Sequence, residues 1–321
     1  MRNRMKSARL YTIFWVAVLL GGVFSSCDHT PERKTTFAVV PKVDDASVAL
    51  AKAAALAARE RYDVAVRWDV SYRPTAASQA ELIDKLVQAG VDGILLSCID
   101  ASDAELREAI DAAVAAGVFV GTFDSDAPGS ARSFYIGSDQ TAAGELAAVT
   151  LRELCTEGGR AATGIGLFGG VEGDAAMAQR LAGFLPEVPD TAALLWSGDV
   201  PATGRKQATD FLTDEAQLPI NGVVFLSGTT LAEANSIGGM ARLDSLCRAA
   251  TEAEEGAAAA AVFFDPTNDV LEFVHRMPHC AAIRQDYPVM VNGGIERLLR
   301  LVRGEGNGGG EVVYTPVEVI R

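Results

Sequence analysis

The stretch that decides the fold is VDGILLSCIDASDAELREAIDAAVAAGVFVGTFDSDAP, residues 91–128. It contains a continuous apolar run at 93–98, an amphipathic segment at 102–116 that ends at Gly117, and a second apolar run at 118–123. Strands that are apolar at every position are typical of parallel sheets covered by helices on both faces. The stretch therefore predicts a strand–helix–strand unit of a parallel sheet.

The same alternation of strand and helix runs along the chain up to 135–137 and then starts again. Further strands are expected at 36–41, 64–70, 164–168, 192–197, 222–226, 259–264, 281–284 and 312–320. Further helices are expected at 46–61, 76–89, 142–154, 175–185, 203–213, 231–250 and 289–303. Two such runs of similar size, in chain order, predict an α/β fold made of two doubly wound, Rossmann-like lobes.

The first 26 residues read as a signal peptide for export. A basic start is followed by the apolar core Leu10–Leu20, which is about half of the roughly 20 residues needed to cross a bilayer. Small residues then lead to Cys27, and this pattern resembles bacterial lipoprotein signals, in which the cysteine carries the lipid. Phe24 replaces the usual Leu, Val or Ile, so cleavage by an ordinary signal peptidase stays an alternative. We expect a lipid-anchored protein in the periplasm or elsewhere outside the cytoplasm, with 27–34 as its tether.

The composition excludes several classes of partner. The 321 residues carry a formal net charge of −14, and removal of the basic leader makes the chain more acidic still. Nucleic acid and anionic membrane surfaces repel such a chain. We therefore expect no nucleic-acid partner, and membrane contact through the lipid anchor alone.

No motif predicts catalysis, a cofactor or a metal site. Residues 164–169 spell G-x-G-x-x-G, but the residues between these glycines are apolar and read as a strand, whereas nucleotide-binding glycines lie between strand and helix. The three histidines are expected in the tether (His29), at a helix end (His275) and in the following loop (His279). We expect a protein that is not an enzyme.

The cysteines leave two interpretations open. Beyond the leader the chain has Cys98, Cys155, Cys247 and Cys280, none of them in a C-x-x-C or other zinc-like spacing. An oxidising compartment permits disulfides among these four in three full pairings. Buried free thiols are an equally good interpretation, and the sequence does not choose between them.

Polar residues follow several of the expected strands directly. Ligands of doubly wound sheets bind beyond the carboxyl ends of the strands, so these positions are candidates for a site. They are Asp124, Ser125, Asp126, Asp199, Asp265 and Gln285, with Arg180 on the helix at 175–185. Each alone suits a turn or a helix cap. Together they suit a neutral polyhydroxylated ligand, because carboxylates accept from hydroxyl groups while Arg and Gln donate to hydroxyl oxygens.

An ordered series of short motifs resembles the type I periplasmic binding proteins of sugar ABC transporters, the ribose-binding-like group. The motifs are Phe37-Ala-Val-Val-Pro-Lys42, Gly90-Val-Asp-Gly-Ile-Leu, Thr122-Phe-Asp-Ser-Asp-Ala-Pro128, Tyr135-Ile-Gly-Ser-Asp139 with Ala143-Gly144, Gln179-Arg180-x-x-Gly-Phe184, Phe263-Phe-Asp265, Ile283-Arg-Gln-Asp-Tyr-Pro288 and Tyr314-Thr-Pro-Val. They cover almost all of 35–321. The resemblance implies that the protein captures a small polar ligand, a monosaccharide, between its lobes and delivers it to an ABC permease.

The resemblance also implies which residues bind the ligand and where the lobes join. The family's sugar-lining positions fall on Asp124, Arg180, Asp265 and Gln285, and the same motifs contribute Lys42 and Ser125. The three crossings between lobes match the segments around Ser138, Gln285 and Val312. The expected lobes are therefore 35–137 with 286–312, and 138–285 with 313–321.

Some departures from the family pattern leave the identity of the ligand open. The loop at 43–49 has no aromatic residue where the family stacks one on the sugar, and Ser227 leads to Gly-Thr-Thr rather than to an Asn or Asp pair. Trp68 and Trp196 are candidates to compensate, although packing explains both equally. A sensory receptor of the same fold, signalling to a kinase or chemoreceptor, is the alternative function. A cytoplasmic repressor is excluded by the leader and by the lack of an N-terminal helix-turn-helix.

Overall fold

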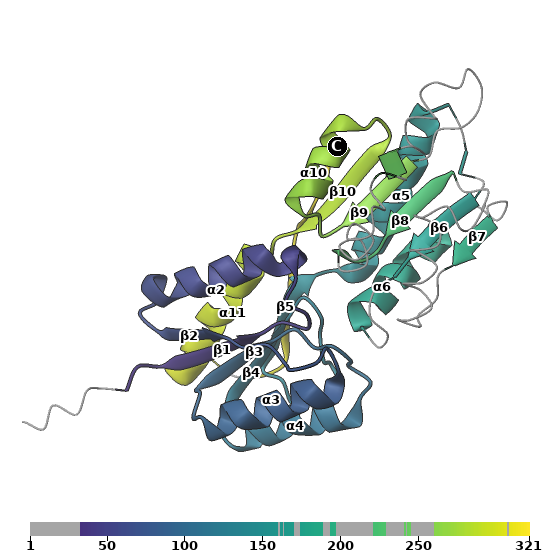
Figure 1. Cartoon of the computed structure of the whole chain (residues 1–321). Helices are drawn as coiled ribbons and strands as arrows, with labels where there is room; N and C mark the ends of the chain where they lie inside the picture. Colours follow the sequence, from purple (N-terminus) through teal and green to yellow (C-terminus); the bar gives the residue numbers. More distant parts are fainter. Residues whose placement is uncertain are drawn as a thin grey trace, which may run out of the picture. The chain divides into compact units, whose positions relative to one another are not determined.

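Two six-stranded sheets form the framework of the chain (Figure 1). The computed structural model describes residues 33–159, 161–162, 164–169, 174–188, 193–196, 221–228, 241, 243–244, 260–306 and 308–321. The first sheet has the strand order β11-β5-β4-β3-β1-β2, and the second has the order β12-β10-β9-β8-β6-β7. The two orders correspond strand by strand, so the sequence prediction of two doubly wound halves is confirmed.

The first sheet is parallel throughout. Its strands are β1 (Thr36–Val40), β2 (Ala65–Trp68), β3 (Gly93–Leu96), β4 (Phe119–Phe123), β5 (Phe134–Ser138) and β11 (Glu311–Thr315). Its helical segments are η1 (Ala46–Val48), α2 (Ala49–Arg61), α3 (Ala76–Gln88), α4 (Ala104–Ala115) and α11 (Tyr287–Val302).

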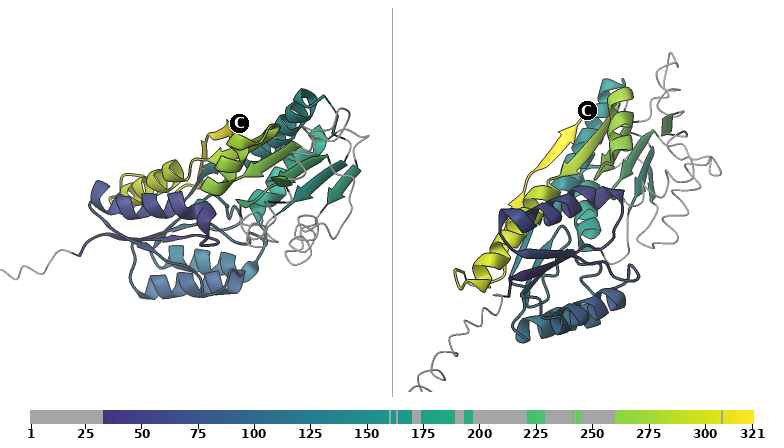
Figure 2. Two further views of the ribbon diagram at one scale, coloured as in Figure 1. Left: turned by 45° about the horizontal axis from the view of Figure 1, so that its top comes forward. Right: turned by 60° about the vertical axis from the view of Figure 1, so that its left-hand side comes forward.

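Helices cover both faces of this sheet, with α2 and α11 on one face and α3 and α4 on the other (Figure 2). In β1, Phe37 and Val39 pack toward α2 and α11, whereas Ala38 and Val40 pack toward α3 and α4. All four side chains are fully buried. The continuous apolar runs in the sequence are therefore strands with two buried faces, as predicted.

The second sheet repeats this plan with one antiparallel edge strand, β12. Its strands are β6 (Gly164–Phe168), β7 (Ala193–Trp196), β8 (Gly222–Phe225), β9 (Ala260–Phe264), β10 (Cys280–Gln285) and β12 (Val317–Ile320). Helices α5 (Gln140–Glu157) and α6 (Ala175–Phe184), with the short η2 (Leu185–Glu187), line one face, and α10 (Asn268–Arg276) packs on the other.

Helix ends follow local capping chemistry. Asp103 precedes α4 and its Oδ1 accepts from the backbone N–H of Leu106 at 2.8 Å. Gly117 follows α4 with a φ of +88°, a conformation that costs a glycine little because it has no Cβ. These two residues fix where the helix begins and ends, and so where the next strand starts.

The last part of the chain differs from the prediction. A single strand was expected at 312–320, but β11 and β12 are separate strands that belong to different sheets. Pro316 lies between them, and proline has no N–H to donate to a sheet ladder. The final passage from one sheet to the other therefore lies at Pro316 and not at Val312. The exact lobe boundaries remain a prediction.

Several other predictions can be checked against the described residues. β6 spans Gly164–Phe168, so the first glycines of the G-x-G-x-x-G spelling lie within a strand, as predicted. No helix of the described residues is long and apolar enough to span a membrane. The leader with Cys27 and His29 and the helix expected at 203–213 lie outside the described residues, as do Cys247 and most of 231–250.

Candidate ligand-binding site

Six residues predicted from the sequence meet at the carboxyl ends of the strands. We call them the polar ring: Lys42, Asp124, Ser125, Arg180, Asp265 and Gln285. Lys42 follows β1, Asp124 and Ser125 follow β4, and Asp265 follows β9, while Gln285 ends β10 and Arg180 lies in α6. The fold therefore brings together residues separated by up to about 240 positions in the chain, and the contacts below connect all six.

Asp124 is the acceptor at the centre of the first half of the ring. Its side chain is 2% exposed, and Oδ2 lies 2.9 Å from the Ser97 hydroxyl and 3.1 Å from Lys42 Nζ. Oδ1 has longer contacts of 3.4 Å with Gln285 Nε2 and with the Tyr287 hydroxyl. One carboxylate thus contacts residues from four strand or helix ends.

Arg180 is the central donor of the second half and is fully buried. Its Nη1 donates to the carbonyl oxygen of Leu226 and lies 3.2 Å from Asp265 Oδ2. The guanidinium carbon stands 4.2 Å from the centroid of the Phe264 ring, within the range of a cation–π contact. Among the described residues, the second terminal nitrogen, Nη2, has no hydrogen-bond partner. A buried N–H without an acceptor is costly, and an acceptor on a ligand would remove that cost.

Asp174 belongs to this site although the sequence analysis missed it. It is the N-cap of α6, and its Oδ1 accepts from the Ala176 N–H and from the Ser125 hydroxyl, each at 2.9 Å. Its Oδ2 lies 2.6 Å from Lys42 Nζ. Asp174 follows β6 by several residues rather than directly, so a search of the positions just after strands does not find it. The aspartate immediately before a helix was the available signal.

Two further residues, Gln140 and Tyr287, were also missed. Gln140 begins α5 and Tyr287 begins α11, and both are buried. Gln140 contacts Arg180 and Gln285, and Tyr287 contacts Asp124 and Gln285. Both follow the end of a strand by two residues, within the segments already matched as passages between the lobes.

Asp124 and Asp265 occupy equivalent places in the two sheets, because β4 and β9 hold the same position in their strand orders. Both have left-handed backbones, with φ of 59° and 50°. Aspartate tolerates this region better than most residues, and such conformations are concentrated at functional sites. Because their positions are equivalent, the two carboxylates face one site, one from each half of the chain.

The charges of the site shift the pKa values of these two carboxyls in opposite directions. Burial opposes ionisation of Asp124, but Lys42 and Arg180 outweigh it and lower its pKa below the usual value. Burial dominates at Asp265 and raises its pKa, although Arg180 partly offsets the effect. Burial also disfavours the charged form of Lys42, yet Asp124 and Asp174 outweigh it and raise the pKa of Lys42. The cations therefore stay charged, and Asp265 is the carboxyl that protonates most readily.

Other candidates from the sequence lie outside the ring. Asp126 pairs with Arg132, with Oδ2 2.7 Å from its Nη2. Trp68 donates from Nε1 to Asp44 at 3.2 Å, and it lies 5.8 Å from the Lys52 ammonium. Asp199 and the side chain of Trp196 lie outside the described residues.

The described histidines lie around the end of α10, and two of the described cysteines are buried free thiols. His275 lies in the last turn of α10, and His279 lies in the loop after it. Cys98 and Cys155 are buried free thiols, and burial raises their pKa values to about 12 and about 11. Within the described ranges, no group of three His, Cys, Asp or Glu side chains is placed to hold a metal ion.

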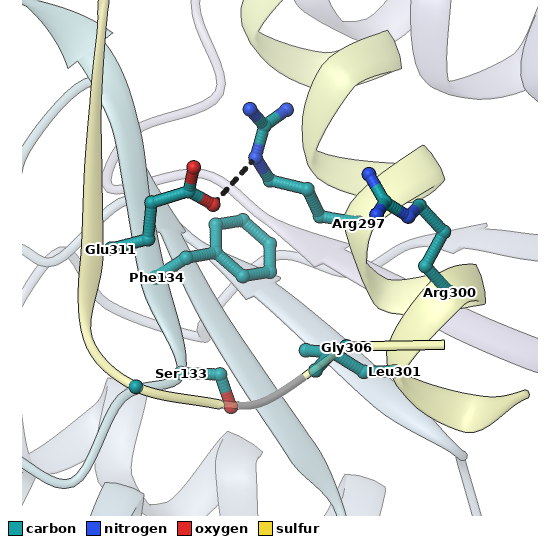
Figure 3. Close-up of a pocket in the computed structure, with 8 residues that line it drawn as sticks. Ser133, Phe134, Arg297, Arg300, Leu301, Gly306 and Glu311 are labelled. Carbon is teal, nitrogen blue, oxygen red and sulfur yellow. Dashed lines mark hydrogen bonds and ion pairs between the residues drawn. The ribbon is translucent and has the colours of Figure 1, made fainter. Parts of the chain in front are cut away.

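A pocket of about 450 Å³ lies at the opposite end of the first sheet (Figure 3). Ser133 and Phe134 stand at the start of β5, Glu311 at the start of β11, and Arg297 and Arg300 near the end of α11. Arg297 Nε lies 3.3 Å from Glu311 Oε2. None of the polar ring lines this pocket. Since ligands of doubly wound sheets bind at the carboxyl ends of the strands, the ring is the stronger candidate.

Comparison with known proteins agrees with the fold. The model of the periplasmic binding protein domain matches residues 37–306. No curated protein matches the sequence. Many solved structures match, and three of them are described next.

An ABC transporter solute-binding protein from Burkholderia graminis, solved with D-arabinose, has a TM-score of 0.72 and 22% identity over 89% of this chain and 94% of its own. An ABC transporter periplasmic solute-binding protein from Actinobacillus succinogenes, with bound D-allose, has a TM-score of 0.72 and 20% identity over 89% and 97%. LsrB from Clostridium saccharobutylicum, in complex with AI-2, has a TM-score of 0.72 and 17% identity over 89% and 97%. At these identities the likeness shows a shared fold.

Proposed function

The chain belongs to the periplasmic binding protein domain family, and from that premise we propose that it captures a small neutral polyhydroxylated ligand, a monosaccharide, at the polar ring. Proteins of this family are binding proteins rather than enzymes, and they work outside the cytoplasm. The neighbours solved with D-arabinose and D-allose support a sugar as the ligand class.

The observation that carries this proposal is the buried Nη2 of Arg180, which has no partner among the described residues. The guanidinium interacts electrostatically with three buried carboxylates, those of Asp265, Asp124 and Asp174. A hydroxyl group can accept from the guanidinium and donate to a carboxylate at the same time. A ligand with several adjacent hydroxyls meets both requirements without bringing a charge into the site.

A thermal-shift screen of the protein against D-arabinose, D-allose, D-glucose and matched polyols tests the proposal. A ligand present at 100 times its dissociation constant should stabilise the folded state by about 2.7 kcal/mol. The control is the Arg180→Met variant with the same panel, which should lose the shift. If no sugar or polyol in the panel stabilises the protein, the proposed ligand class is wrong.

We also propose that the protein is a lipoprotein anchored through Cys27 and that it delivers its ligand to an ABC permease. The leader pattern supports the anchor, and the family supports the transport role. Replacing Cys27 by Ala should move the protein from the membrane fraction to the soluble exported fraction. A Cys27→Ala variant that still sediments with membranes would contradict the anchor.

A sensory receptor is the second candidate function. It needs only the same closing cleft as transport, so ligand binding by itself does not separate the two roles. The match to LsrB in complex with AI-2 adds AI-2 to the thermal-shift panel as a further ligand. A neighbouring gene for a permease would support transport, whereas one for a sensor kinase or chemoreceptor would support this second candidate.

A further inference from the structure

Gln140 connects the two halves of the site. It is 1% exposed, and it is the first residue of α5, just after the chain leaves β5 of the first sheet. Its Oε1 accepts from Arg180 Nε at 2.8 Å. Its Nε2 donates to Gln285 Oε1 at 2.9 Å and to the backbone carbonyl of Asp124 at 3.3 Å. Every polar atom of this side chain is therefore used inside the protein.

The orientation of the Gln140 amide is fixed from both ends. Arg180 Nε can only donate, so the atom that faces it has to be the amide oxygen. The carbonyl of Asp124 can only accept, so the atom that faces it has to be the amide nitrogen. Turning the amide over would place two donors together and two acceptors together.

The orientation of Gln285 is fixed at one end by Gln140 and at the other by Asp265. Because Gln140 presents its nitrogen, Gln285 presents its oxygen to it. The nitrogen of Gln285 then faces Asp265 Oδ1 at 2.8 Å, with a longer contact of 3.4 Å to Asp124 Oδ1. The direction of donation runs from Arg180 through both glutamines to the two carboxylates.

We propose that Gln140 is a positioning residue that, together with the Asp265 carboxylate, fixes the direction of the hydrogen bonds that run from Arg180 Nε through Gln285 to the carboxylates of Asp124 and Asp265. In this role it does not touch the ligand. It keeps the Gln285 amide donating to both carboxylates, and it holds the Arg180 guanidinium through Nε so that Nη2 is left for a ligand oxygen. The effect on ligand affinity rests on the proposed function, whereas the direction of the hydrogen bonds does not.

The Gln140→Glu variant tests the direction of these hydrogen bonds with almost no change in the shape of the side chain. Glutamate still accepts from Arg180 but cannot donate to Gln285 or to the Asp124 carbonyl. The Gln285 amide oxygen then faces either the new carboxylate or, if the amide turns over, Asp265 Oδ1, so two acceptors meet in either orientation. Affinity for the sugar that most stabilises the wild type among D-arabinose, D-allose and D-glucose should fall about 10-fold to 100-fold.

Two control variants separate the effect of hydrogen-bond direction from the effects of side-chain packing and of a buried charge. Gln140→Met keeps the volume and removes the polarity, and it should lower affinity less than Gln140→Glu because it removes hydrogen bonds without placing two acceptors together. Gln79→Glu makes the same substitution at a fully buried glutamine that contacts only backbone groups, the Ser97 carbonyl and the Ile99 N–H. It should lower the melting temperature with a much smaller loss of affinity. Equal affinities for Gln140→Glu and Gln140→Met would overturn the proposal.

A readout without ligand distinguishes failure of this proposal from failure of the proposed function. In nitrogen-15 spectra of the ligand-free protein, the side-chain amide protons of Gln140 and Gln285 should exchange slowly with water, because both groups are buried and bonded. The Gln285 signals should move strongly in Gln140→Glu and stay in place in Gln79→Glu. Unchanged Gln285 signals in Gln140→Glu would overturn the proposal even if a sugar binds. If no sugar binds the wild type, the function fails while these spectra still decide the role of Gln140.

Discussion

Asp124 and Asp265 combine a left-handed backbone with a buried charge, and the two properties can be separated by substitution. Asparagine keeps the backbone preference and removes the charge, whereas alanine removes both. Asp124→Asn should weaken ligand binding by roughly 2–5 kcal/mol, which is about 30-fold to several thousand-fold, because Lys42 and the ligand hydroxyls lose a charged partner. Titration calorimetry measures this loss.

The matched control for the backbone is Asp63, which also has a left-handed φ, of 52°, and precedes β2, at the end of the first sheet opposite the ring. Asp63→Ala should lower the free energy of unfolding by an amount on the order of 1 kcal/mol with unchanged ligand affinity. Asp124→Ala should show this backbone effect in addition to the loss of binding. Full affinity in Asp124→Asn would remove Asp124 from the proposed site.

The opposite pKa shifts of the two carboxyls predict opposite effects of pH on stability. The pKa of Asp124 is lowered in the folded state, so its contribution is present above the unfolded value of about 3.9 and is lost as pH falls through the folded value. The pKa of Asp265 is raised, so its ionisation becomes a destabilising contribution as pH rises from the unfolded value through the folded one. Asp124→Asn should therefore destabilise more at pH 7 than at pH 3, and Asp265→Asn should destabilise less than Asp124→Asn at pH 7.

Denaturant unfolding of the two variants and the wild type between pH 3 and pH 7 measures this difference. Lys42 contributes no change in this range, since its pKa is raised and it stays protonated. Equal pH dependence in the two variants would mean that the two carboxyls have the same environment, contrary to the structure.

At the scale of elements, the close crossing of α5 and α6 places Arg180. A Cβ at Gly144 would lie 1.9 Å from the carbonyl oxygen of Arg180, and a Cβ at Gly183 would lie 1.9 Å from that of Thr141. The two backbones therefore touch, and neither glycine can gain a methyl group without moving α6. Gly144→Ala should cost about 1–3 kcal/mol of stability and should also weaken ligand binding, because Arg180 moves with its helix.

Gly293→Ala in α11 is the control for this prediction. Its added Cβ would meet the end of the Ile136 side chain, which can adjust, and neither of its neighbours, Ile136 and Arg297, belongs to the polar ring. Calorimetry and thermal melting of both variants should show loss of affinity in Gly144→Ala alone. Unchanged affinity in Gly144→Ala would mean that Arg180 is placed by its own hydrogen bonds rather than by the helix crossing.

Element type was predictable from the sequence because each strand and helix has its own hydrophobic pattern. The strands 93–98 and 118–123 and the helix between them needed only local residues. Positions after the expected strands, with one helix, supplied five members of the ring, and the family motifs added Lys42. Asp174 and Gln140 were not predictable in the same way, since their contacts with Lys42 and Arg180 depend on how α5 and α6 cross. The two strands at 311–320 also read as one, because both are apolar and only sheet membership separates them.

At the scale of the whole molecule, the ring contains direct contacts between residues attached to different sheets. Lys42 and Ser125 follow strands of the first sheet, and both contact Asp174, which follows β6 of the second. The chain passes between the sheets after Ser138, after Gln285 and at Pro316. Such few-stranded passages are typical of hinges that close around a ligand.

We expect the protein to become more compact when its ligand binds. Small-angle scattering with and without saturating sugar should show a smaller radius of gyration in the complex. Asp174→Asn weakens the contact with Lys42, so it should reduce the compaction, while the exposed control Glu187→Gln should not. An unchanged radius at demonstrated saturation would contradict closure.

The position of α11 in the chain has a consequence for synthesis and export. Its buried side chains, among them Tyr287, Met290, Ile295 and Leu298, form much of the core between α2 and the first sheet. β11, the edge strand of that sheet, comes later still. A nascent chain that has emerged only as far as β10 therefore has its N-terminal residues but lacks a large part of the core that holds them. The core of the N-terminal half is completed only by residues near the end of the chain, so we expect this half to stay unfolded until almost the whole chain has been made, a state that suits export through a secretion channel.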